Sequence, residues 1–247
     1  MEVELLAVVF IIFLLAGTVK GVIGLGLPTV SLAALTVVVE LPVAIVLMVI
    51  PSAVTNIWQA FDGPHLAMLL RRFGIMLLAS ALGVWFSYGL VLIANPKSMT
   101  GLLGVVLSIY SLTNLRGGGL LPPISHERLV SPVVGLATGA LAGATGSLVM
   151  PMVPYLQALR LDRDALVQMM GLSFAVSTCA IGLAAFEHGN FDNELAWTSL
   201  ASLAPAIVGM KFGQALRRRL SEDIFRRCLF IGLLVIGVRL MWKGFVA

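Results

Sequence analysis

Apolar residues follow one another in long, nearly uninterrupted blocks along the whole 247-residue chain. The blocks lie at about 3–19, 28–39, 42–61, 73–94, 98–115, 129–143, 147–159, 164–186, 195–215 and 223–244. A helix needs about 20 apolar residues to cross the hydrocarbon core of a bilayer. Several blocks reach this length, whereas 3–19 is marginal and 28–39, 129–143 and 147–159 are short. The pattern predicts an all-α, polytopic membrane protein and excludes a single signal peptide as its explanation.

The short blocks come in two pairs, and a glycine-rich break divides each pair. The first break is "GTVKGVIGLGLP", residues 17–28, and the second is "GALAGATGSLVMP", residues 139–151. Three glycine positions match at one common offset: Gly17 with Gly139, Gly21 with Gly143 and Gly24 with Gly146. Pro28 and Pro151 match after a slip of one residue. The two breaks therefore look like copies of one feature.

Further similarities follow in the same order along the chain. The stretch "AVTN" at 53–56 aligns with "AVST" at 175–178, and "GVVLSIYSL" at 104–112 aligns with "GLLVIGVRL" at 232–240. Internal symmetry of this kind is common in transporters, and chance similarity among helices rich in Leu, Ala and Gly is the alternative. We interpret the chain as a first transmembrane repeat, a cytoplasmic linker and a second transmembrane repeat, at 1–115, 116–128 and 129–247.

The basic residues distinguish two ways of threading the chain through a membrane. If each broken pair is one kinked spanning helix, the chain crosses eight times and the basic residues divide eight against six. If each broken pair is a hairpin that returns to the side it entered from, eleven share one side: Arg71, Arg72, Arg116, Arg128, Arg160, Arg163, Arg217, Arg218, Arg219, Arg226 and Arg227. Only Lys97, Arg239 and Lys243 then lie opposite, and both counts leave out Lys20 and Lys211 because these lie within apolar segments. The positive-inside rule favours the hairpins, with the eleven in the cytoplasm and both termini outside.

The hairpin topology has a consequence for the two halves. Each half then consists of a Gly/Pro-broken helical hairpin followed by three transmembrane helices, and the second half is inverted relative to the first. Inverted repeats with discontinuous helices are a recurrent plan of secondary transporters, which bind substrate near the midplane at the repeat interface. Whether the hairpins are re-entrant or fully spanning stays open at this point.

Composition agrees with a membrane protein and excludes several other classes. Only 11% of the residues are charged and 59% are apolar, whereas soluble domains carry about 25% charged residues. Basic cytoplasmic loops explain the net charge of +4 most simply, so we expect no nucleic-acid partner. Cys179 and Cys228 lie in apolar blocks without metal-site spacing. No phosphate-binding P-loop, serine elbow or zinc signature is present, and we expect neither an enzyme nor a cofactor nor a metal.

The breaks carry the candidate chemistry. Glycine permits a turn inside the membrane, and Pro28 and Pro151 stand where a new half-helix would begin. The N-terminus of a half-helix presents free N–H groups and a positive dipole end, which together favour an anion. Lys20 adds a costly charge to a membrane segment and could pair with an anionic substrate. The alternative is that its side chain snorkels to the membrane interface.

Other polar residues could line a substrate path. Thr145 and Ser147 add hydroxyls to the second break, and back-bonding to their own helix is the alternative. Asn56 follows Pro51, and Gln168 lies on the corresponding segment of the second half; interhelical hydrogen bonding is the alternative for both. The candidate substrate-binding residues are Lys20, Gly21, Gly24, Gly26, Pro28, Asn56, Gly143, Thr145, Gly146, Ser147, Pro151 and Gln168.

These motifs give the chain a family resemblance: it looks like the sulfite exporter TauE/SafE family of integral membrane permeases. The likeness rests on the paired breaks, with "PSAVTNIWQ" after the first and "GLSFAVST" after the second, and covers nearly the whole chain. It implies transport of sulfite, organosulfonates or related small anions across the cytoplasmic membrane, without ATP hydrolysis by the permease itself. The family's motif positions correspond to Gly21, Gly24, Gly26, Pro28, Gly143, Gly146 and Pro151. The first motif, "GLGLP", is less glycine-rich than the common family pattern, and Ser147 stands where glycine is frequent.

The residues and the resemblance lead to one main hypothesis, a secondary transporter of a small anion in the inner membrane. It would move sulfite, an organosulfonate or a related sulfur-containing anion by alternating access, with the substrate held at the two broken-helix tips. No acidic residue lies clearly within a membrane segment, so a carboxylate proton relay is not indicated, while a coupling proton or sodium ion stays open. The alternatives are an exporter of another small metabolite and a non-transporting membrane assembly factor. Membrane lipid is the other expected partner, and the oligomeric state and the direction of transport stay open.

Overall fold

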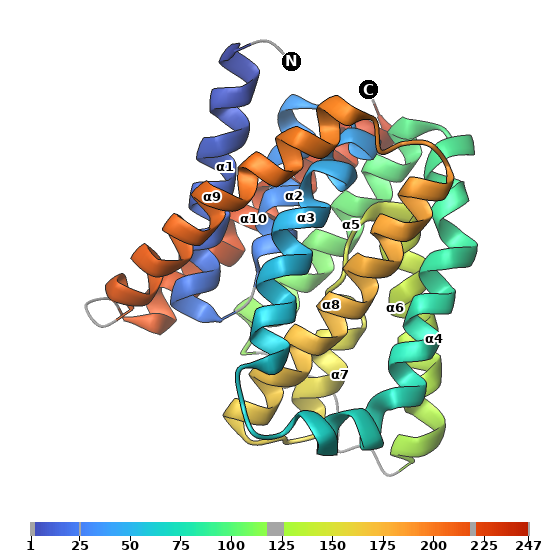
Figure 1. The fold of residues 1–247 in the computed structure, drawn as a ribbon, viewed down its shortest axis with the longest axis vertical. Helices are drawn as coiled ribbons and strands as arrows, with labels where there is room; N and C mark the ends of the chain where they lie inside the picture. Colours follow the sequence, from blue (N-terminus) through green and yellow to red (C-terminus); the bar gives the residue numbers. More distant parts are fainter. Residues whose placement is uncertain (1–2, 25, 118–125, 218–220, 247) are drawn as a thin grey trace.

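The computed structural model describes residues 3–24, 26–117, 126–217 and 221–246, and these residues form ten α-helices and no strand. The helices are α1 (Val3–Ile23), α2 (Leu27–Val38), α3 (Leu41–Phe61), α4 (Leu66–Ile93), α5 (Pro96–Leu115), α6 (Glu127–Thr145), α7 (Met152–Ala158), α8 (Arg163–Glu187), α9 (Asn193–Leu216) and α10 (Glu222–Phe245) (Figure 1). Each predicted apolar block corresponds to one helix, so the all-α prediction is confirmed.

Seven of the described helices are long and apolar enough to cross a membrane: α1, α3, α4, α5, α6, α8 and α9. The prediction of a multi-pass membrane protein is therefore confirmed. α10 is not among the seven, and its 24 residues include Arg226, Arg227, Arg239 and Lys243. That α10 crosses the membrane stays a prediction.

The two arms of each broken pair differ in length. α1 has 21 residues and α6 has 19, whereas α2 has 12 and α7 only 7. The prediction that 129–143 is a short segment is wrong, because α6 runs from Glu127 to Thr145. Glu127 places a negative charge at the positive end of the helix, which stabilises a start before the apolar stretch. Only the second arm of each pair is too short to cross a bilayer.

Both broken pairs fold back on themselves. Leu5 near the start of α1 and Glu40 after the end of α2 line the same pocket, together with Lys243 of α10. In the second pair, the hydroxyl of Tyr155 on α7 shares a hydrogen bond with the hydroxyl of Ser131 on α6. Each pair thus returns toward the end of the molecule from which it started, as the hairpin topology requires.

One end of the helix bundle is rich in arginine. Arg71, Arg72 and Arg128 line a single pocket there. The α3–α4 and α7–α8 connections meet close by, since His65 Nε2 lies 3.8 Å from Asp162 Oδ1. We call this the basic end, and it comprises residues 62–72, 127–128, 160–164 and 217. Of the residues predicted to be cytoplasmic, Arg218, Arg219 and linker positions 118–125 lie outside the described residues.

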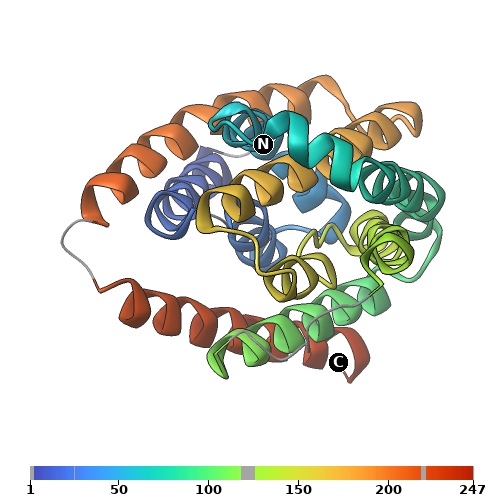
Figure 2. The ribbon, with the colours of Figure 1, turned by 90° about the horizontal axis from the view of Figure 1, so that it is seen from below.

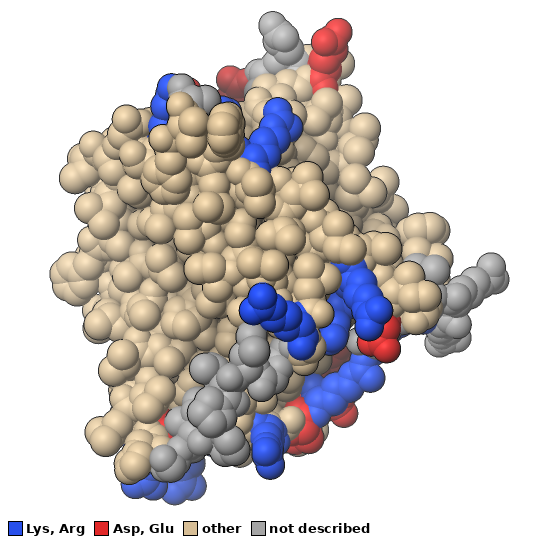
Figure 3. All heavy atoms as spheres, turned by 180° about the vertical axis from the view of Figure 1, so that it is seen from behind, with Lys and Arg blue, Asp and Glu red and all other residues tan. Residues whose placement is uncertain are grey.

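The opposite end, which we call the acidic end, carries Glu40, Asp192 and Glu194 around one pocket with Lys243. The start of α1 and the end of α10 both lie toward this end, at the top of Figure 1. On the face drawn in Figure 3, most Lys and Arg side chains gather in the lower half, and a broad surface without charged side chains lies beside and above them. Such an uncharged surface suits contact with lipid. Which end faces the cytoplasm stays a prediction.

The long helices pack in four main pairs. α1 lies along α9, α6 along α4, α5 along α10 and α3 along α8. Seen from below, α9 and α10 lie on opposite sides of α1 and α2 (Figure 2). In the predicted repeat order, α1 corresponds to α6 and α4 corresponds to α9. The symmetry that relates the two halves would therefore convert the α1–α9 pair into the α6–α4 pair. The pairing therefore has the symmetry expected of two related halves, and the repeat boundaries stay a prediction.

Glycines allow two of these pairs to approach very closely. A Cβ atom at Gly21 of α1 would lie 2.2 Å from the carbonyl oxygen of Met210 on α9. A Cβ atom at Gly139 of α6 would lie 2.0 Å from the carbonyl oxygen of Ser80 on α4. Small residues at helix crossings are typical of membrane proteins, where close backbone contact replaces the hydrophobic effect.

Candidate functional site

Lys20 lies in the last turn of α1 and is only 4% exposed. Its ammonium donates hydrogen bonds to Asn56 Oδ1 and, over 3.2 Å, to Thr55 Oγ1, both on α3. Neither partner is charged, and within the described residues Lys20 forms no ion pair. Burial of an ammonium is costly, so a lysine held inside the bundle by neutral groups points to function rather than to snorkelling.

α3 presents hydrogen-bonding groups to this lysine. Thr55 Oγ1 donates over 2.8 Å to the carbonyl of Pro51 one turn earlier, which leaves its lone pairs for the ammonium. Asn56 uses Oδ1 on Lys20, while its Nδ2 is buried and has no hydrogen-bond partner among the described residues. Buried N–H groups are normally paired. The ammonium and the amide N–H groups are therefore neighbouring donors, which suits the oxygens of an anion.

A pocket of about 240 Å³, which we call the Lys20 pocket, opens beside this cluster. Its lining comprises Lys20, Gly21, Gly24, Thr55, Trp58, Gln59, Asp62, Val167, Met210, Gln214 and Arg217. Asp62 and Arg217 belong to the basic end, so the pocket lies toward that end of the bundle. With two cationic side chains and one anionic side chain, the pocket favours negatively charged molecules.

α3 and α8 run antiparallel beside each other. Gly171 of α8 lies against Gln59 of α3, and Gly182 lies against Val49. Between these two contacts, four buried side chains have a polar atom without a hydrogen-bond partner among the described residues: Ser52, Asn56, Ser173 and Thr178. Such atoms are rare in proteins. The part of the α3–α8 pair between these two contacts is therefore the part of the described chain that best fits a polar substrate path.

Both breaks contain glycines in the left-handed conformation. Gly24 (φ 87°) and Gly146 (φ 75°) follow α1 and α6, and each donates its N–H over 2.7 Å to the carbonyl four residues earlier. Gly26 (φ 107°) directly precedes α2. Residues with a Cβ adopt this conformation only at a cost, so the breaks need glycine. Pro28 in the first turn of α2 and Pro151 directly before α7 confirm the predicted half-helix starts.

The second break packs against α2 and α3. A Cβ atom at Gly146 would meet the side chains of Ile45 and Leu32. Thr145 Oγ1 donates over 2.7 Å to the carbonyl of Leu141, which is the back-bonding alternative. Ser147 Oγ is buried and lacks a hydrogen-bond partner within the described ranges. No hydrogen bond among the described residues joins this break to Lys20, so a site shared by both break tips stays a prediction.

The side chain of Gln168 forms hydrogen bonds to the main chain at the end of α3 and in the α3–α4 connection. Its Nε2 donates to the carbonyls of Ala60 over 2.8 Å and Gly63 over 3.0 Å. Its Oε1 accepts from the main-chain N–H of His65 over 3.0 Å. These bonds satisfy the end of α3 and the connection into α4. Because both ends of the amide are engaged, these contacts favour a structural role, and that Gln168 binds substrate stays a prediction.

Gly21 and Gly143 both face a neighbouring helix. At Gly143 a Cβ atom would lie 2.1 Å from Ser87 Oγ and 2.6 Å from the carbonyl oxygen of Val84, both on α4. Gly21 packs against α9 in the same way and also lines the Lys20 pocket. Of the predicted site residues, the structure thus brings together Lys20, Gly21, Gly24 and Asn56.

Several residues of the Lys20 pocket were not selected from the sequence, Thr55 and Arg217 among them. Thr55 stands beside Asn56, and the polar face that it shares with Ser52 and Gln59 was the available signal. Arg217 was counted only as a topology determinant, because its place in the Lys20 pocket depends on the packing of α9 against α1. Sequence patterns within α9 do not show that packing.

Comparison with known proteins adds one finding to this geometry. The family model described as sulfite exporter TauE/SafE matches residues 9–240, which is nearly the whole chain. Comparisons with curated proteins and with solved structures gave no match.

Proposed function

Since the chain belongs to the sulfite exporter TauE/SafE family, we propose that it moves a small sulfur-containing anion across the cytoplasmic membrane by alternating access. Sulfite and organosulfonates are the substrates to consider first, because the family description names sulfite and both carry sulfur-bound oxygens. The family is one of membrane transporters and not of enzymes. The substrate would bind in the Lys20 pocket with Lys20 as the donor in its lining, and Asn56, which hydrogen-bonds Lys20 but does not itself line the pocket, would be a second donor next to it.

The buried ammonium of Lys20 carries the proposal. Its two partners, Thr55 and Asn56, are neutral, so an anion in the pocket would supply the compensating charge. The Nδ2 group of Asn56 would supply a further donor beside the ammonium. Hydrogen bonds to a charged partner are roughly twice as strong as those between neutral groups. A cationic substrate would gain nothing from this arrangement.

Equivalent contacts in the two halves differ in a way that supports alternating access. In the predicted repeat, Gly24 is equivalent to Gly146 and Ile45 is equivalent to Val167, because the members of each pair are 122 positions apart. A Cβ atom at Gly24 would lie 3.8 Å from Val167, whereas one at Gly146 would lie 2.8 Å from Ile45. The contact beside the Lys20 pocket is thus the looser of the two. In the opposite state of the cycle, the contact at Gly146 would loosen and that at Gly24 would tighten.

Counterflow of labelled sulfite or methanesulfonate into proteoliposomes tests the proposal. Lys20→Met removes the charge while keeping an unbranched side chain. We expect at least about a tenfold loss of rate, because a hydrogen bond to a charged group contributes about 1.5–3 kcal/mol. Lys211→Met is the matched control, since Lys211 is exposed on α9. Equal rates in the two variants would contradict the proposed site.

The same vesicles separate the alternatives. Imposed proton and sodium gradients show whether either ion drives the anion uphill. Exchange of an amino acid or a cation, without exchange of any anion, would favour an exporter of another metabolite. A folded protein that exchanges none of these solutes would favour a membrane assembly factor.

A further inference from the structure

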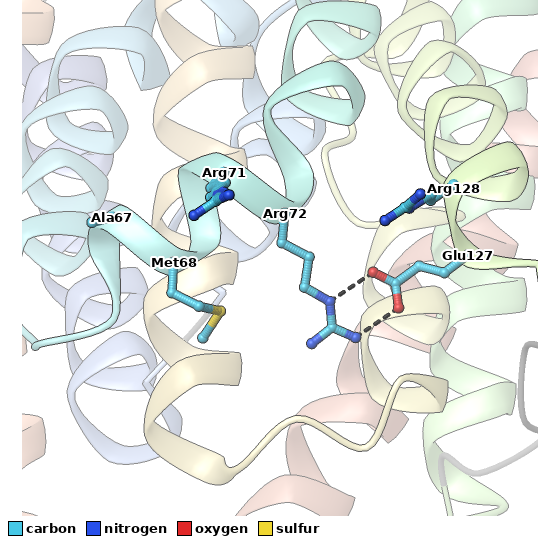
Figure 4. A pocket seen from close by; sticks show the side chains of 6 residues that line it. All are labelled: Ala67, Met68, Arg71, Arg72, Glu127 and Arg128. Carbon is cyan, nitrogen blue, oxygen red and sulfur yellow. Dashed lines mark hydrogen bonds and ion pairs between the residues drawn. The ribbon is translucent and has the colours of Figure 1, made fainter.

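A second basic pocket lies between the starts of α4 and α6. It has a volume of about 680 Å³, and its lining comprises Ala67, Met68, Arg71, Arg72, Glu127 and Arg128 (Figure 4). None of these residues lines the Lys20 pocket. Three arginines against one glutamate leave the pocket with an excess of positive charge.

One ion pair forms the wall of this pocket. Nε and Nη2 of Arg72 donate to Oε1 and Oε2 of Glu127 over 2.7 Å and 2.6 Å. This bidentate pair joins α4 to α6 and uses the charge of both side chains. In Figure 4, Arg71 lies to the left of the pair and Arg128 lies just above Glu127, and neither forms an ion pair within the described residues. Two guanidinium groups are therefore left for a ligand.

Beyond Arg71, the face of α4 that begins at the pocket is apolar. Spacings of three and four residues place five side chains on this face: Met68, Arg71, Ile75, Leu78 and Leu82. Ile75 is 71% exposed, Leu78 67% and Leu82 54%. Leu78 and Leu82 also line an apolar groove of about 580 Å³ among α3, α4 and α8. Arg71 lies only about 10 Å along the helix from Leu78. One lipid molecule is therefore long enough to reach both the Arg71 guanidinium and the groove.

We propose that the pocket and the groove bind one anionic phospholipid, with its phosphate between Arg71 and Arg128 and an acyl chain in the groove. Guanidinium groups bind phosphate oxygens through paired N–H donors. Basic pockets between transmembrane helices attract anionic head groups. Free phosphate would use the arginines alone, whereas the adjoining apolar groove favours a lipid. Such a site is independent of the transported substrate.

Native mass spectrometry of the purified full chain in detergent tests the lipid site. The probes are dioleoyl phosphatidylglycerol, dioleoyl phosphatidylcholine and glycerol 1-phosphate. We expect the chain to retain phosphatidylglycerol in preference to phosphatidylcholine. Arg71→Gln combined with Arg128→Gln should weaken phosphatidylglycerol binding about 25-fold, because each basic residue near a membrane surface contributes about fivefold.

A matched double variant controls for the loss of charge. Arg116 and Arg227 are exposed residues at the end of α5 and the start of α10 and line neither pocket. Arg116→Gln combined with Arg227→Gln should leave lipid affinity unchanged. Equal weakening in both double variants would overturn the site, as would unchanged binding when Arg71 and Arg128 are both replaced. If that double variant does not fold, Arg128→Gln alone should weaken binding about fivefold, and unchanged binding would overturn the site.

The soluble probe separates a lipid from free phosphate. If glycerol 1-phosphate displaces phosphatidylglycerol at equal concentration, the pocket takes free phosphate and the lipid assignment is overturned. Ala180→Phe fills the groove while both arginines remain. It should weaken phosphatidylglycerol binding without changing the binding of glycerol 1-phosphate, and unchanged lipid binding would show that the groove holds no acyl chain.

Discussion

Ser199 on α9 donates a hydrogen bond of 2.8 Å to the main-chain carbonyl of Leu47 on α3. In an unbroken helix this carbonyl would accept from the N–H four residues later, but that residue is Pro51, which has none. The N–H of Ile50 donates to the same hydroxyl over 3.3 Å. A neighbouring helix thus satisfies the group that proline leaves unpaired, as membrane proteins require. α3 can therefore contain a proline five residues before Asn56 without an unsatisfied carbonyl.

Removing this hydroxyl should be costly only while the proline is present. We expect Ser199→Ala to lower the free energy of unfolding by about 1–3 kcal/mol, because the carbonyl of Leu47 is left buried and unpaired. Pro51→Ala restores the helical N–H, so Ser199→Ala should cost much less in that background. Thermal unfolding of the four chains in detergent gives the coupling energy. Strictly additive effects would show that Ser199 does not compensate for Pro51.

The α1–α9 crossing predicts opposite effects for two glycine substitutions. Gly21→Ala should destabilise the protein by about 1–3 kcal/mol, since the new Cβ would overlap the backbone of α9. A Cβ atom at Gly74 on α4 would meet no atom of another described element within 4 Å, so Gly74→Ala should stabilise by up to about 1 kcal/mol through helix propensity. Thermal unfolding in detergent measures both. Equal stability of the two variants would argue against close contact between α1 and α9.

Gln168 should act on stability and not on substrate affinity. Gln168→Leu leaves the carbonyls of Ala60 and Gly63 and the N–H of His65 without their partner. We expect a loss of about 2–3 kcal/mol of stability and an unchanged KM for the transported anion. Gln168→Glu keeps the acceptor but not the donors, so it should also destabilise. A raised KM with normal stability would return Gln168 to the substrate path.

The breaks could be predicted because their causes are local. Gly24 and Gly146 need a left-handed backbone, and Pro28 favours a helix start; each of these properties belongs to one residue. Charge patterning along the chain also indicated the hairpins, since they place most arginines on one side. The length of α6 was underestimated because Glu127 and Arg128 are charged, although charged residues are common at helix ends.

The contacts between helices could not be predicted in the same way. Lys20 and Asn56 were each selected for their polarity, but their hydrogen bond depends on how α1 packs beside α3. Gln168 was selected as a path-lining residue for its polarity, and its bonds to the carbonyls at the end of α3 depend on a helix contact that the sequence does not show. Arg217 enters the pocket through the α1–α9 pair. Sequence periodicity describes one helix at a time and leaves such pairings undetermined.

Asn56→Asp should separate stability from transport. A carboxylate at this position would pair with the Lys20 ammonium and take the place of the substrate's charge. We expect stability at least equal to that of the unmodified chain, with anion counterflow reduced at least about tenfold. Asn190→Asp, in the α8–α9 connection, changes the charge by the same amount away from the pocket and should transport normally. Undiminished counterflow in Asn56→Asp would mean that Lys20 does not hold the anion.

The two ends of α8 provide a test of membrane orientation. Asp164 in its first turn and Glu187 at its last residue are both exposed, and the helix between them is about 35 Å long. Cys179 and Cys228 are free and exposed, so the test requires Cys179→Ser and Cys228→Ser as background. If the basic end is cytoplasmic, a membrane-impermeant maleimide added to intact cells should label Glu187→Cys at once. It should label Asp164→Cys only after permeabilisation.

The reverse labelling pattern would place the basic end outside, against the positive-inside rule. Labelling of both positions from outside would show that α8 does not cross the membrane at all. The result for α8 alone does not distinguish a hairpin from a single kinked span, because α8 crosses the membrane in both; a cysteine at Arg128, exposed at the start of α6, makes that distinction. A hairpin returns the chain to the side from which it started, so Arg128→Cys and Asp164→Cys should be labelled from the same side, whereas a single kinked span would place them on opposite sides.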